Sequence, residues 1–103
     1  MSSQVRRITL FKIPDVEDQK ALIAKYNNMQ KSALKDGKPY IVSVHAGKAK
    51  HDQRAQGYTV AALSTFEDME GFEYYDTECE AHKSLREFTK SCVQGFCMVY
   101  FES

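Results

Sequence analysis

A change of hydrophobic period between residues 57 and 88 constrains the fold of this chain more than any other feature. Up to Phe66 the residues alternate in the manner of a strand, with one face made by Tyr58, Val60, Ala62, Ser64 and Phe66. After Phe66 the apolar residues recur at spacings of three and four, which is typical of a helix. We expect two linked helical segments here, the first carrying Met69, Phe72, Tyr74 and Tyr75 and the second Cys79, His82, Leu85, Arg86 and Phe88.

The segments before this unit predict a strand, a helix and a second strand. Residues 5–13 form the first strand, with Ile8 and Leu10 on one face and Thr9, Phe11 and Ile13 on the other. Asp15 is the expected N-cap of a helix that runs to about residue 35, whose apolar stripe is Leu22, Ile23, Tyr26, Met29 and Ala33.

Asp36-Gly37 is the expected C-terminal stop of that helix. Residues 40–46 predict the second strand of the sheet, and the polar, basic residues 47–56 predict an exposed hairpin loop. Residues 96–101 (FCMVYF) predict the last strand, as a continuous apolar run of the kind found where both faces are covered.

The resulting order, β-α-β-β-α-β, predicts an α+β ferredoxin-like fold with a four-stranded antiparallel sheet. Two helices cover only one face of such a sheet, yet the first, third and fourth strands carry apolar residues on both faces. A homodimer in which two sheets face each other and close into an α/β barrel would bury the second face. The alternative is that the second face is a modest apolar surface patch.

Composition excludes several classes of protein. A chain of 103 residues fits a single domain, residues 1–103. Lysine plus arginine (14) equals aspartate plus glutamate (14), which argues against a nucleic-acid partner. No apolar run approaches the roughly 18 residues of a membrane span, and no secretory signal is evident. Three cysteines without framework spacing indicate free thiols, so we expect a cytoplasmic protein.

His82 is the strongest candidate for chemistry. A histidine that faces a cavity is a suitable general base for removing a proton beside a carbonyl group, and a nearby tyrosine hydroxyl can hold the enolate oxygen. The alternative is that His82 packs at a helix–sheet junction, and that Tyr26 and Tyr75 are core aromatics with a polar tip. Cys79-x-x-His82 is a weak metal motif, because no second pair of ligands accompanies it.

The chain resembles the stress-responsive dimeric α/β-barrel domain (Dabb) family over residues 5–102. The resemblance lies in G-Y-T, a hydrophobic strand and F-E within residues 57–67, then Tyr75, and then Ala81-His82. It implies a ferredoxin-like protomer, a homodimer, and a cavity between each sheet and its helices.

Plant polyketide cyclases of this family perform an aldol condensation with a histidine base and a tyrosine, without metal or cofactor. The resemblance therefore implies His82 as base, with Tyr75 and Tyr26 as pocket tyrosines. Two further histidines of those cyclases correspond to Arg7 and Val60, and Glu80 replaces a proline.

Three functions follow as hypotheses. The first is that the protein binds a small, apolar, polyketide-like carbonyl compound and cyclises or isomerises it without a cofactor. The second is a non-catalytic stress-responsive homodimer that sequesters a hydrophobic molecule. The third is a quinol oxygenase without cofactor, which rests on fold analogy.

Overall fold

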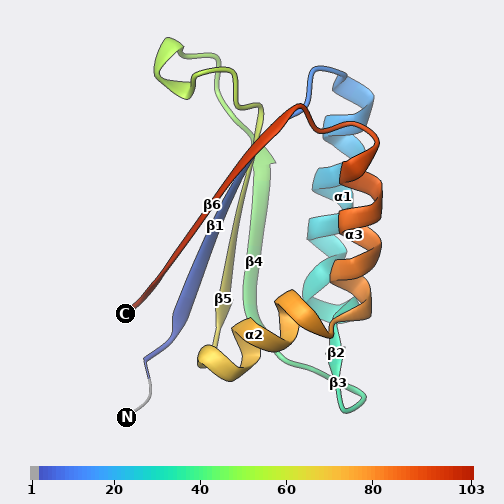
Figure 1. The fold of residues 1–103 in the computed structure, drawn as a ribbon, viewed down its shortest axis with the longest axis vertical. Coiled ribbons are helices and arrows are strands. Elements are labelled where there is room, and N and C mark those ends of the chain that lie inside the picture. The colour runs from blue at the N-terminus through green and yellow to red at the C-terminus, as the bar shows by residue number, and fades with distance from the viewer. Residues whose placement is uncertain (1–2) are drawn as a thin grey trace.

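Two long helices lie side by side on one face of a twisted four-stranded sheet in the computed structural model, which describes residues 3–103 (Figure 1). The elements follow one another as β1 (Val5–Lys12), α1 (Val16–Ser32), β2 (Leu34–Lys35), β3 (Lys38–Pro39), β4 (Ile41–Lys48), the 3-10 turn η1 (Gln53–Ala55), β5 (Val60–Phe66), α2 (Met69–Thr77), α3 (Glu80–Lys90) and β6 (Gly95–Glu102).

The sheet order is β4-β5-β1-β6, and all neighbouring strands are antiparallel. The expected α+β ferredoxin-like fold is confirmed. Strand β1 lies between β5 and β6, so its alternation decides both faces of the sheet. Val5, Arg7, Thr9 and Phe11 are buried beneath the helices, whereas Ile8 and Leu10 lie on the opposite face and are half-buried.

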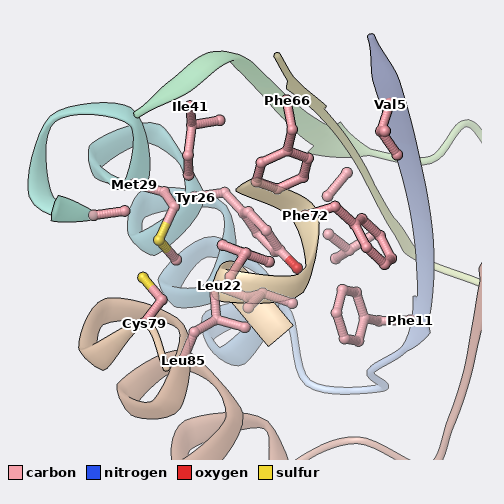
Figure 2. Packing of buried hydrophobic residues seen from close by; sticks show 14 of the residues in the cluster. Val5, Phe11, Leu22, Tyr26, Met29, Ile41, Phe66, Phe72, Cys79 and Leu85 are labelled. Atoms are coloured by element: carbon pink, nitrogen blue, oxygen red, sulfur yellow. The ribbon is translucent and has the colours of Figure 1, made fainter. Parts of the chain in front are cut away.

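The hydrophobic core lies between the helices and this covered face of the sheet (Figure 2). Helix α1 buries Leu22, Tyr26 and Met29, as the stripe predicts. Figure 2 shows Leu85 of α3 pointing toward α1, and Phe66 and Phe72 lying nearer the sheet. Full burial of one such large side chain contributes about 1.5–3 kcal/mol, so this cluster fixes where the helices lie.

Helix α1 begins where expected and ends earlier than expected. The Asp15 side chain accepts hydrogen bonds from the backbone N–H groups of Glu17 and Asp18, which confirms the N-cap. The helix ends at Ser32 rather than near residue 35. Asp36 and Gly37 have φ angles of 54° and 78°, so they form the tight turn of a hairpin between β2 and β3 instead of a helix stop.

Strand β6 differs from the other three strands because neither of its faces is fully covered in this chain: Tyr100 packs on Phe72 of α2 with ring centroids 4.3 Å apart, yet every residue of the strand except Gly95 and Met98 is exposed. Helix α1 lies mainly over β4 and β5, and α3 packs against α1, which leaves β6 at an uncovered edge. Phe96 is 63% exposed and Val99 is 54% exposed, although the apolar run predicts cover on both sides. Within residues 3–103, the apolar side chains of this strand are therefore left largely without cover.

Within residues 3–103, no helix has both the length and the apolar character that crossing a membrane requires. Strand β4 extends to Lys48, two residues beyond the predicted end, and the following loop with η1 projects from one end of the sheet (Figure 1).

Candidate functional site

A cavity of about 360 Å³ lies between α3 and the part of the sheet formed by β1 and β6. Helix α1 lies mainly over β4, and β6 has no comparably close helix above it, which leaves this space open. Its polar side chains are Arg7, Thr9, Tyr26, Asp76, His82, Arg86, Thr89 and Lys90. Its apolar side chains are Phe11, Leu85, Val93, Phe96 and Met98. Two of the three predicted site residues, Tyr26 and His82, therefore lie on one cavity.

The backbone of α2 holds the His82 ring in one orientation. The last carbonyls of a helix lack partners within that helix, and Tyr75 lies in the last turn of α2. A short break at Glu78 and Cys79 lets α3 turn back, so that His82 in its first turn reaches the Tyr75 carbonyl at 2.8 Å from Nδ1. A carbonyl only accepts hydrogen bonds, so Nδ1 carries the proton and Nε2 keeps its lone pair.

The environment keeps His82 neutral. The pKa of His82 is lowered to about 4, chiefly by burial and also by the positive charges of Arg7 and Arg86, against the opposing effects of the bond to the Tyr75 carbonyl and of the Asp76 charge. The side chain is 3% exposed. At neutral pH the imidazole is therefore an uncharged acceptor through Nε2, and it is a weak base.

Tyr75 lies beside His82 through its ring and its carbonyl. The two rings stack with centroids 3.8 Å apart and planes 13° apart. The Tyr75 hydroxyl is buried and has no hydrogen-bond partner among residues 3–103, and this side chain does not line the cavity. Tyr75 thus orients the histidine, whereas its hydroxyl points into the core.

Tyr26 is the tyrosine that reaches the cavity. Figure 2 shows its hydroxyl pointing from α1 toward the side of Phe11, and the two ring centroids are 6.2 Å apart. Burial raises the pKa of Tyr26 far above its usual value, although Arg7 opposes this effect. The hydroxyl therefore stays protonated and is available as a hydrogen-bond donor.

Arg7 and Asp76 are site residues that the sequence argument did not select. Arg7 Nη1 donates to Asp76 Oδ1 at 2.9 Å, and the guanidinium carbon lies 5.2 Å from the Tyr75 ring centroid. The signal for Arg7 was its position in the alternation of β1, on the same face as Val5 and Phe11. Asp76 has no comparable signal in the sequence.

Val60, the second position at which the resemblance showed a departure, is fully buried and does not line the cavity. Of these two differences from the plant cyclases, Arg7 is therefore the one that changes the lining of the cavity. Among residues 3–103, no group of three or more His, Cys, Asp or Glu side chains converges, so Cys79 and His82 lack the further ligands of a metal site.

Comparisons with known proteins agree with this architecture. A Fusaristatin A biosynthesis cluster protein of Gibberella zeae is 37% identical over 106 residues, which cover 99% of this chain and 75% of that protein. A hydroxynitrile lyase from Passiflora edulis has a TM-score of 0.81 at 18% identity, covering 100% of this chain and 95% of that one. A dimeric ferredoxin-like protein from Thermobifida fusca has a TM-score of 0.78 at 17% identity, covering 100% and 93%.

The two solved structures show the shared fold, and the relative from Gibberella zeae shows that the likeness extends to sequence. The family model described as the stress responsive A/B barrel domain matches residues 5–103, from the first residue of β1 to the C-terminal residue. The chain belongs to the stress responsive A/B barrel domain (Dabb) family.

Proposed function

We propose that the cavity binds a small apolar carbonyl compound and that His82 removes a proton from it without metal or cofactor. One observation carries this proposal: the bond from Nδ1 to the Tyr75 carbonyl leaves the Nε2 lone pair on a residue that lines the cavity. A general base has to be held in one tautomer and within reach of its substrate, and this bond fixes the tautomer.

The weak basicity of His82 restricts the substrate. A base whose conjugate acid has a pKa of about 4 cannot deprotonate an ordinary ketone efficiently, but it suits the acidic carbon between two carbonyl groups. Nε2 would take that proton, giving an imidazolium and an enolate. The enolate carbon would attack a second carbonyl of the same molecule and form a C–C bond. The new alkoxide would then recover the proton from the imidazolium.

Tyr26 is the donor we assign to the enolate oxygen, because its protonated hydroxyl side chain lines the same cavity. Tyr75 serves as the positioning residue for His82. Two similar proteins support small-molecule chemistry here, since one is a biosynthesis cluster protein and one is a hydroxynitrile lyase.

The test uses a linear poly-β-ketone ester with a short alkyl tail, with ring formation followed by chromatography and mass spectrometry. His82→Asn retains an N–H group near the position of Nδ1 and removes Nε2. We expect it to lower the rate above background by roughly 10²–10⁴-fold. His51→Asn, in the exposed loop between β4 and η1, should leave the rate unchanged. Full activity of His82→Asn would refute the assignment of the base.

A second candidate is a ligand-binding protein of the stress-responsive type that performs no turnover. The low pKa of His82 and the buried Tyr75 hydroxyl favour it, since neither is tuned for proton transfer at neutral pH. The same assay separates the two functions: tight binding of the poly-β-ketone with no ring formation above background would establish sequestration.

We also propose that the uncovered face of the sheet pairs with a second copy of this chain. Leu63, Ile8 and Val99 are aligned across β5, β1 and β6 on that face, and Val99 and Phe101 remain about half exposed. Similar proteins described as dimeric share the fold. Two such faces packed together would bury these side chains and form the barrel.

Ile8→Glu tests this assembly, because it places a charge at the centre of the apolar row. Light scattering should report a dimer for the wild-type chain and a monomer for the variant. Val16→Glu is the matched control, since Val16 is 48% exposed at the start of α1 and away from the sheet. A wild-type monomer, or an Ile8→Glu dimer of unchanged stability, would contradict the pairing.

A further inference from the structure

Arg7 is a buried cation with unused hydrogen-bond donors. Its side chain is 9% exposed, and its ion pair with Asp76 engages Nη1 alone. A guanidinium carries five N–H donors, and no other hydrogen bond from this group is formed within residues 3–103. The Nε and Nη2 edge is thus free on a residue that lines the cavity. Neither atom is among the buried side-chain atoms that lack a partner, so water reaches this edge through the cavity, and an acceptor on a ligand can take the place of that water.

The charges around the cavity favour an anion. Its lining contains three cationic side chains, Arg7, Arg86 and Lys90, and one anionic side chain, Asp76. Lys90 also pairs with Glu87 at 3.0 Å, but both side chains of that pair are 72% exposed and water screens them. Asp76 is 40% exposed and offsets only part of the charge. His82 is neutral and does not change this balance of charge.

The remaining wall is apolar. Phe11, Leu85, Phe96 and Met98 line it, and the volume of about 360 Å³ is at the small end of ligand pockets. An occupant that satisfies both halves of the cavity has a compact hydrocarbon body and one anionic group. A carboxylate matches the Nε and Nη2 edge of an arginine because its two oxygens accept two parallel hydrogen bonds.

We propose that the cavity selects small apolar carboxylic acids, with the carboxylate bound by Arg7 and the hydrocarbon body against Phe11 and Met98. This inference rests on the proposed function and narrows it: the substrate would be an apolar oxo acid rather than a neutral ketone or ester. Arg86 and Lys90 at the cavity would add attraction that salt weakens.

Calorimetric titration with three compounds of equal length tests this selection: 4-phenylbutyrate, its primary amide, and 5-phenyl-2-pentanone. We expect the wild-type protein at pH 7 to bind the acid at least about tenfold more tightly than the amide or the ketone. Arg7→Gln should abolish the preference. Arg6→Gln should retain it, because Arg6 is the neighbouring residue on the other face of β1.

The outcomes separate the two proposals. Equal binding of the acid and the ketone would overturn the carboxylate inference and leave the proposed function standing. No binding of any of the three would count against both. If Arg7→Gln does not fold, the wild-type comparison is decisive together with Arg86→Gln, which should weaken binding of the acid alone by roughly two- to fivefold. An acid preference that survives Arg7→Gln in a folded protein would overturn the role of Arg7.

Discussion

Arg6 and Arg7 are neighbours on β1, yet they lie on opposite faces of the sheet and in different environments. Arg7 is buried under the helices, paired with Asp76 and packed on aromatic rings. Arg6 lies on the uncovered face, where its Nε donates to the exposed Ser103 hydroxyl at 3.0 Å. The helices thus turn one face into a cavity with a fixed histidine, whereas the other face remains a half-exposed apolar surface suited to a second copy.

The largest difference in the free energy of unfolding is expected between substitutions at two phenylalanines, one on each face of the sheet. Phe66 is fully buried and contacts the rings of Phe72 and Tyr75, whereas Phe101 is 47% exposed on the uncovered face. We expect Phe66→Ala to lower the free energy of unfolding by about 3–5 kcal/mol. Phe101→Ala should cost less than about 1 kcal/mol in dilute protein. The cost should be larger at high protein concentration, because the wild-type chain then forms dimer contacts that the variant lacks. Urea titrations at two protein concentrations measure both; equal costs would remove the distinction between the faces.

The second-largest effect is expected on the side of the sheet that the helices cover, where His82 should make the free energy of unfolding depend on pH. The pKa of His82 is about 4 in the folded chain, against about 6.5 when unfolded, so between these values the unfolded chain binds the proton and the folded chain does not. Stability therefore falls as the pH falls from 6.5 to 4, and His82 contributes on the order of 3 kcal/mol to that loss. His82→Asn should flatten the curve by this amount over this range. Parallel curves for the two proteins would show that His82 is not held neutral.

The two arginines should show the smallest difference in stability. Arg7→Gln removes the ion pair to Asp76 and the packing on Tyr75 and Phe72, and we expect a loss of about 1–2 kcal/mol, limited because Asp76 is partly exposed. Arg6→Gln should stay within about 0.5 kcal/mol. Thermal unfolding of both variants checks this order, and a reversed order would mean that Arg6 rather than Arg7 is the structurally held charge.

The sequence predicted most of the fold because alternation and helical spacing are local properties. The two faces of β1, the stripe of α1 and the helix pair α2 and α3 all followed from them. The end of α1 did not, since Asp36-Gly37 suits both a helix stop and a hairpin turn. The residues on both sides of this pair, which form β2 and β3, decide between these two structures, and their pairing is not visible in the spacing.

The site was predicted only in part. His82 and Tyr26 were expected and share the cavity, but Tyr75 acts on His82 through a backbone carbonyl, which every residue has. The cavity itself arises because α1 lies mainly over β4, at the far edge of the sheet from β6, which is a property of the assembled layers. Asp76 becomes relevant only because α2 brings it to Arg7.

The most direct test of the site is a nitrogen-15 NMR measurement of the three histidines at neutral pH, with and without 4-phenylbutyrate. We predict that His82 is neutral with the proton on Nδ1, that its signal moves when the acid is added, and that the signals of His45 and His51 do not move. A His82 that is charged at neutral pH, or that carries its proton on Nε2, would contradict the fixed base on which the proposed chemistry depends.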